Sequence, residues 1–348
     1  MSKRISTTLH TRGRFAALTV ALCSASCGGI QNALNPSRPQ AENLSRLWWL
    51  MFTVCSIVFV LVIVAVLLAL RNRTRDSEQA APMLEPPREQ ELRRRNVVAS
   101  AVGITIVILF VFLIVSFMAG RSMTAELANK NGLNIEINGH QWWWEVRYDD
   151  VDASNIFTTA NEIHIPVGVP VVFSLRASDV IHSFWVPNLS GKKDLIPGKI
   201  NTIWLQADKP GVYRGQCAEY CGLQHAQMAF WIVAEPQEQF NAWRQNQTQT
   251  SVPPSTDSQK RGQQVFLTAT CVMCHAINGT TAGSNVGPNL THIASRNTIA
   301  AATLANTREH VRQWIVDSQS VKPGNKMPQN NLGEADLQAL VDYLQILK

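Results

Sequence analysis

Residues 215–228 read "GQCAEYCGLQHAQM" and place Cys217, Cys221, His225 and Met228 within twelve positions. Thiolate, thioether and imidazole groups are soft or borderline metal ligands, and redox copper sites combine Cys and His with a weak Met. Zinc has little use for the methionine. The segment therefore predicts a copper site.

Two readings of the cysteine pair stay open at this point. A close pair outside the cytoplasm ordinarily forms a disulfide. A bare disulfide, however, needs neither the adjacent His225 and Met228 nor an upstream partner such as His182 in "VIHSFWVP". Two cysteines, two histidines and a methionine exceed the needs of one blue-copper ion but suit two coppers bridged by both sulfurs.

The region around this segment, residues 132–243, is rich in β signals. "LNIEINGHQWWWEVRYDD" and "NEIHIPVGVPVVFSLRA" are examples of its β-branched and aromatic runs, which Gly and Pro interrupt. Short strands at this spacing predict a sandwich or small barrel. A polar, Pro-bearing linker is predicted over 244–259. Residues 260–348 then show helical spacing, as in "EADLQALVDYLQIL".

Two apolar segments within residues 45–120 predict membrane-spanning helices over about 47–70 and 97–119. "LWWLMFTVCSIVFVLVIVAVLLAL" and "NVVASAVGITIVILFVFLIVSFMAG" carry no charge, and each exceeds the roughly 20 residues that cross a bilayer. None of the eight histidines lies in either segment. The two predicted spans therefore offer no imidazole ligand for a metal or a haem.

The positive charge is concentrated near the membrane. Residues 1–120 hold 13 Lys+Arg against 6 Asp+Glu, whereas residues 121–348 hold 18 against 19. This distribution argues against a nucleic-acid partner. It places the Arg-rich loop 71–96 in the cytoplasm, with both termini and the predicted domains on the opposite side.

Residues 1–27 resemble a secretory signal. A basic stretch precedes the apolar run "FAALTVAL" and the small residues "CSASC". Cys27 is a candidate for lipidation, and plain cleavage or an uncleaved anchor are the alternatives.

"CVMCH" at 271–275 is the C-x-x-C-H haem attachment signature. Together with "GPNL" and "KPGNKMP", it makes residues 260–348 resemble a class I cytochrome c, an all-α domain. The resemblance implies thioether bonds from Cys271 and Cys274 to a covalent haem c, with His275 and Met327 as axial ligands. Met273 and His292 are the rival axial candidates, and a redox C-x-x-C pair is the alternative.

"GHQWWWEVRY", "DVIHSFWVPNLSGKKDLIPGK" and "PGVYRGQCAEYCGLQHAQM" resemble cytochrome c oxidase subunit II over about residues 47–243. The resemblance implies a two-helix membrane hairpin and a cupredoxin-like domain. It also implies a dinuclear copper A centre and a surface tryptophan, Trp142, that receives electrons. The side chain of Glu219 would also reach a magnesium ion at the boundary with subunit I. The implied copper ligands are His182, Cys217, Glu219 through its backbone carbonyl, Cys221, His225 and Met228.

The combined resemblance is to a subunit II with a fused cytochrome c, as in caa-type haem-copper oxidases. It implies an electron-input subunit in a bacterial inner (plasma) membrane, which supports oxygen reduction to water coupled to proton translocation. Its partners would be subunit I, other oxidase subunits and a donor such as cytochrome c or a quinol-cytochrome c reductase. The family's usual proton-uptake Glu lies in a "WTxxP"-like context that is missing here, so Glu89 and Glu91 are the candidates. A metal-free quinol oxidase subunit II and an electron carrier for another reductase are the alternatives.

Overall fold

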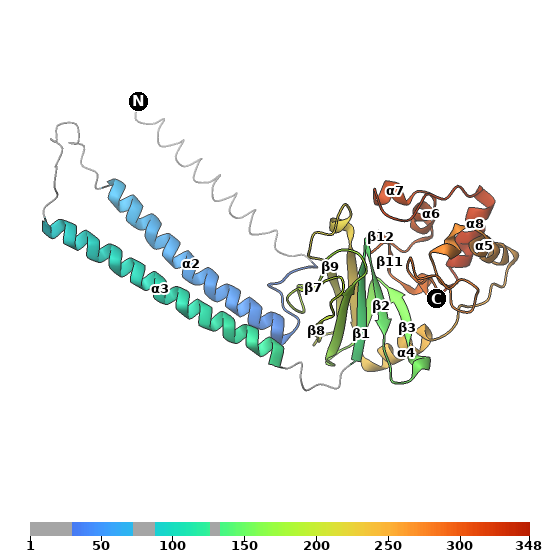
Figure 1. The fold of residues 1–348 in the computed structure, drawn as a ribbon, viewed down its shortest axis with the longest axis horizontal. Coiled ribbons are helices and arrows are strands. Elements are labelled where there is room, and N and C mark those ends of the chain that lie inside the picture. Colours follow the sequence, from blue (N-terminus) through green and yellow to red (C-terminus); the bar gives the residue numbers. More distant parts are fainter. Residues whose placement is uncertain (1–29, 72–87, 126–132) are drawn as a thin grey trace, which may run out of the picture. The chain divides into compact units, whose positions relative to one another are not determined.

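The computed structural model describes residues 30–71, 88–125 and 133–348. The signal segment and Cys27 lie outside these ranges. Two long helices come first, α2 (Pro39–Arg71) and α3 (Arg88–Ala125) (Figure 1). Their stretches Ala41–Arg71 and Arg88–Arg121 are long and apolar enough to cross a membrane, and their 18-residue apolar windows have mean hydropathy 3.2 and 3.0, respectively.

Both helices extend beyond the predicted spans. A helix continues through polar residues as long as its backbone hydrogen bonds are satisfied, so apolar content marks the span and not the helix ends. The charged residues "REQELRRR" accordingly form the beginning of α3, although they were predicted as part of the loop 71–96.

Residues 133–247, called the β-domain below, fold into a sandwich of two five-stranded sheets, β3-β2-β1-β5-β8 and β4-β10-β9-β6-β7 (Figure 1). The predicted sandwich is therefore confirmed. The strands are β1 (Leu133–His140), β2 (Trp143–Tyr148), β3 (Phe157–Ala160), β4 (Glu162–Pro166), β5 (Val171–Ala177), β6 (His182–Trp185), β7 (Lys193–Leu195), β8 (Asn201–Leu205), β9 (Gly211–Cys217) and β10 (Ala229–Glu235).

Buried and more exposed residues alternate along the strands, and the buried ones form the core of the β-domain. In β1, Ile135 and Ile137 are buried while their neighbours are more exposed, as a period of two requires. In β9, the same alternation directs Tyr213 and Cys217 inward. The hydrophobic core cluster includes Cys217, Cys221 and Met228, so the candidate copper ligands lie at the edge of a packed interior.

Residues 257–348, called the C-terminal domain below, are mainly helical, as predicted. Thr256 and Gln259 form a capping box at the start of the first helix. The first and last helices cross at Gly262, where a β-carbon would lie 2.0 Å from the carbonyl oxygen of Ala339, so this crossing requires glycine. The helices are α5 (Asp257–Thr268), α6 (Arg308–Val316), α7 (Ser318–Val321) and α8 (Glu334–Leu344), and a short hairpin pairs β11 (Thr298–Ile299) with β12 (Leu304–Ala305).

The segment predicted as a linker, 244–259, is partly structured. Helix α4 (Gln237–Gln247) extends into it, and the side chain of Gln247 is buried. Further along, Ser251 N–H donates to the carbonyl of Asn278 at 3.0 Å. The polar composition predicted an unstructured connector, but these residues find hydrogen-bond partners in the C-terminal domain.

Candidate copper and haem sites

The candidate copper ligands come from three strand ends and the loop between two of them. His182 begins β6, Cys217 ends β9, and Met228 immediately precedes β10. Cys221 lies in the loop between β9 and β10, and His225 begins a 3₁₀ turn, His225–Gln227, in the same loop. Because β9 and β10 pair in antiparallel register, the twelve-residue segment returns on itself and brings its two ends together.

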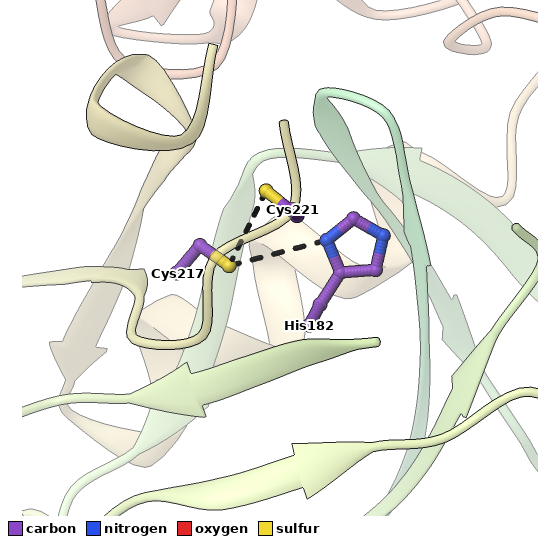
Figure 2. Close-up of side chains that lie close together, drawn as sticks. All are labelled: His182, Cys217 and Cys221. Carbon is purple, nitrogen blue, oxygen red and sulfur yellow. Dashed lines mark hydrogen bonds between the residues drawn. The ribbon is translucent and has the colours of Figure 1, made fainter. Parts of the chain in front are cut away.

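Figure 2 shows the side chains of Cys217, Cys221 and His182 directed toward one another. The Cys217 and Cys221 sulfurs are 3.8 Å apart, and Cys217 Sγ is 3.9 Å from His182 Nδ1. Cys221 Sγ lies 3.7 Å from His225 Nδ1 and 3.8 Å from Met228 Sδ. Ligand atoms of His182, Cys217 and Cys221 all lie within 4.8 Å of one another.

This donor set fits copper. The sulfurs are too far apart for a disulfide, whose S–S bond is about 2.05 Å, and both cysteines are free. A hydrogen bond from Cys221 lowers the pKa of the Cys217 thiol, and that same contact together with burial raises the pKa of Cys221. Two sulfurs that share a proton in this way are poised to bind a soft cation, which displaces the proton.

His182 is oriented by Asp179, a residue that the sequence reasoning missed. Asp179 Oδ1 lies 2.9 Å from His182 Nε2, which leaves Nδ1 directed at Cys217. Burial raises the pKa of Asp179, but hydrogen bonds from His182 and from the N–H groups of Gln141 and Val180 outweigh it and lower the pKa to about 2. Carboxylates commonly hold ligating histidines in this way. The carboxylate three residues before His182 was the available signal.

The haem attachment motif begins on a short 3₁₀ turn, Thr270–Met273, next to α5. His275 Nδ1 lies 2.7 Å from the carbonyl oxygen of Pro288, in the "GPNL" segment, and therefore donates to it. This bond leaves Nε2 as the nitrogen available to iron. Burial lowers the pKa of His275 and favours the neutral, ligating form. Cys271 and Cys274 are free thiols and can form thioether bonds.

Met327 lies on a loop held by several hydrogen bonds. Its carbonyl accepts from Ser318 Oγ at 2.7 Å and from Gln319 Nε2 at 3.0 Å, and its N–H donates to Asn325 Oδ1 at 2.8 Å. The rival His292 has both ring nitrogens against carbonyl oxygens, those of Lys348 at 2.8 Å and Gln249 at 3.2 Å. Neither nitrogen of His292 is therefore free for iron.

Models of known protein families match both of these domains. The model of the family "Cytochrome C oxidase subunit II, periplasmic domain" matches residues 133–235, and that of "Cytochrome c" matches residues 259–348. "Cytochrome c oxidase subunit 2" of Alkalihalophilus pseudofirmus is 36% identical over 97% of this chain and 98% of its own. The chain belongs to the cytochrome c oxidase subunit II family.

Other members of the subunit II family are also similar. "Cytochrome c oxidase subunit 2" of Bacillus sp. strain PS3 is 34% identical over 66% of each chain. The solved periplasmic domain of subunit II from Bradyrhizobium japonicum is 31% identical and covers 34% of this chain and 95% of its own, with a TM-score of 0.33. Membership of this family makes the chain a subunit of a cytochrome c oxidase, an oxidoreductase, with a copper domain and a haem domain, and it assembles with other oxidase subunits.

The three tryptophans of this subunit II at 142–144 have different surroundings. Trp142 is partly buried, and its Nε1–H donates to the carbonyl of Cys221 at 3.0 Å. The Trp143 ring stacks on His140 with centroids 4.4 Å apart. Trp144 is fully buried in the core. Trp142 is therefore the tryptophan that is hydrogen-bonded to a candidate copper ligand.

Glu219 presents its backbone and its side chain to different surroundings. Its carbonyl oxygen lies 3.1 Å from Cys217 Sγ, toward the copper ligands. Its carboxylate is 42% exposed and 3.7 Å from Lys192 Nζ.

Glu89 and Glu91, the candidates for proton uptake, lie exposed in the first turn of α3.

A buried ion-pair cluster surrounds His164 on the β-domain. His164 Nδ1 is 2.9 Å from Glu235 Oε1, and Nε2 is 3.3 Å from Glu162 Oε1. The second oxygen of Glu162 accepts from the N–H of Asn297 in the C-terminal domain at 2.9 Å. Burial lowers the pKa of His164, but the hydrogen bonds to the two carboxylates outweigh it, so its pKa is raised.

This cluster predicts a pH-dependent stability. A raised pKa means that the protonated His164 stabilises the folded state fully below the ordinary pKa of about 6.5, and that this contribution is lost as the pH rises through the raised value. We expect the thermal midpoint of the β-domain to fall over that pH range in wild-type protein and to fall less in His164→Gln. The loss of copper absorption on heating, measured at several pH values, reports the midpoint. Parallel pH profiles for the two proteins would contradict the prediction.

Proposed function

We propose that this chain is the electron-input subunit of a cytochrome c oxidase. In this proposal it takes electrons at a haem c held by residues 271–275 and Met327, passes them to a dinuclear copper A centre near Trp142, and delivers them to subunit I. The convergence of Cys217, Cys221, His225 and Met228 with the distant His182 carries the proposal.

Each part of the chain has a defined task in this reading. Asp179 fixes the ring of His182, and the carbonyl of Glu219 faces the sulfur of Cys217. The β-domain core surrounds Cys217, Cys221 and Met228 and excludes water from them. Cys217 and Cys221, with His182, His225 and Met228, would hold two copper ions, which would supply one-electron transfer at this site. His–Met ligation at His275 and Met327 would raise the haem potential, as a donor to an oxidase requires.

The remaining roles depend on partner subunits. Oxygen reduction to water and the coupled proton translocation would take place in subunit I, because neither predicted span contains a histidine. The carboxylate of Glu219 would contribute to a magnesium site at the boundary with subunit I, and Glu89 or Glu91 would take up protons. In a bacterial inner membrane, both domains and both termini would lie on the periplasmic side, and a cytochrome c or a quinol-cytochrome c reductase would supply the electrons.

Two alternative functions, a metal-free quinol oxidase subunit II and an electron carrier for another reductase, differ in whether they need the two cysteines. A quinol oxidase subunit II without metal would have no use for two facing thiols at 3.8 Å beside two imidazoles and a thioether. An electron carrier for a different reductase would use the same metals. The "DLIPGK" stretch, which resembles the subunit I contact of the oxidases, favours the oxidase.

The metal content of the full-length chain, purified in detergent without its partner subunits, tests the proposal. We expect about two coppers per haem iron and no zinc, because a two-thiolate, two-imidazole, one-thioether set suits a copper pair. A chain with haem but no copper, isolated from copper-replete cells with Cys217 and Cys221 joined in a disulfide, would overturn it.

A further inference from the structure

The loop that carries Met327 packs against the β-domain. This haem-ligand loop, residues 322–327, lies against the copper loop, residues 217–229. Gln224 Nε2 donates to the carbonyl of Pro323, and the side chain of Leu223 lies over Gly324. The candidate axial ligand of the haem and the candidate copper ligands are therefore carried by two loops in direct contact.

Lys322 is the central residue of this contact. Its side chain is only 2% exposed, and its Nζ donates to the carbonyls of Trp142 at 3.2 Å, Gln227 at 2.9 Å and Ala300 at 3.3 Å. Three carbonyls match the three donors of an ammonium group. A buried ammonium is tolerated only with such partners, and two of the three belong to the β-domain. Burial of Lys322 therefore depends on the two domains staying together.

A second loop of the C-terminal domain completes the contact. In this alanine turn, residues 300–303, Ala300, Ala301 and Ala302 have φ of 54°, 57° and 59°, a left-handed conformation that is unfavourable for alanine. Such strain persists where surrounding contacts impose it. Here the N–H of Ala229, next to Met228, donates to the carbonyl of Ala301 at 3.2 Å.

The contact reaches two groups that touch the candidate copper ligands. Lys326 Nζ lies 3.3 Å from Asp179 Oδ2, and the other oxygen of this carboxylate holds His182. Trp142 accepts from Lys322 through its carbonyl and donates through its indole to the carbonyl of Cys221. A short hydrogen-bonded connection thus runs from the haem-ligand loop to the copper loop.

We propose that Lys322, with the alanine turn, holds the C-terminal domain docked over Trp142, so that the copper domain receives electrons from this domain and not from an outside protein. The inference rests on the proposed function, which it extends by naming the surface that the fused domain occupies. Lys322 is a positioning residue. External donor proteins then deliver electrons to the C-terminal domain.

Acetylation of lysines in the full-length chain, with copper and haem bound and within the oxidase, tests the docking directly. We expect Lys322 to react at least tenfold more slowly than Lys260, whose side chain is 61% exposed. Gln224→Glu replaces the buried amide that donates to the carbonyl of Pro323 with a carboxylate that repels this carbonyl, so it should weaken the docking and make Lys322 reactive. Equal labelling of Lys322 and Lys260 in the wild-type chain would overturn the docking.

Electron transfer provides the second readout. After rapid photoreduction of the haem, we expect copper reduction to be at least tenfold slower in Lys322→Met, and unchanged in Lys260→Met, with the copper and haem spectra unaltered. An unchanged rate in Lys322→Met would overturn the positioning role. A chain without copper whose Lys322 is still protected would contradict the proposed function and support the docking, so the two failures are distinguishable.

Discussion

Cys217→Ser is expected to abolish copper binding by the β-domain and, with it, the oxidation of cytochrome c by the assembled oxidase. Serine offers a hard oxygen donor that does not ionise near neutral pH, whereas a copper pair of this kind needs a soft, bridging thiolate. Cys217 is 2% exposed and lies within 3.9 Å of both Cys221 Sγ and His182 Nδ1. The copper-to-iron ratio and the copper absorption of the purified chain measure the loss.

Cys55→Ser is the matched control. Cys55 is also a free cysteine, but it is exposed on α2, within one of the candidate membrane spans. Its replacement should leave the copper content unchanged. Full copper retention in Cys217→Ser would show that the sulfur of Cys217 is not a ligand.

Met327→His is expected to lower the reduction potential of the haem by on the order of 0.2 V, within the roughly 0.8 V range that axial ligands set. Imidazole lacks the thioether's preference for ferrous iron, and His–Met ligation raises the potential. With a lower potential, equilibrium would still favour electron transfer to copper, but a donor of unchanged potential would reduce the haem less completely. A potentiometric titration of the haem absorption measures the shift.

Met273→Leu separates the two candidate methionines. Met273 is 65% exposed in the attachment loop, so its replacement should leave the reduction potential of the haem unchanged. A shift in Met273→Leu with none in Met327→His would assign the axial position to Met273.

The residues that the sequence revealed belong to short segments. Cys217, Cys221, His225 and Met228 lie between the end of β9 and the start of β10, two paired strands, so their close spacing in the sequence already indicates that they meet. The C-x-x-C-H motif is equally local. The apolar helices and the strands can also be predicted locally, because the repeat of apolar residues in a helix or a strand spans only a few positions. His182 lies 35 residues before Cys217; the sequence offered it as an upstream candidate, and the resemblance to the family then implied that it is a ligand.

The tertiary structure alone decided which distant groups support these segments. Asp179 is only three residues from His182 in the sequence, but only the fold shows that its Oδ1 lies 2.9 Å from His182 Nε2. Lys322 meets Trp142 across 180 residues of sequence, and no pattern in "VKPGNKMP" distinguishes a lysine that will be buried from one that will be solvated. The spacing of residues within a short segment determines what that segment can bind. Contacts between remote segments depend instead on how two complete domains pack, and no repeat of residue types within one segment predicts that packing.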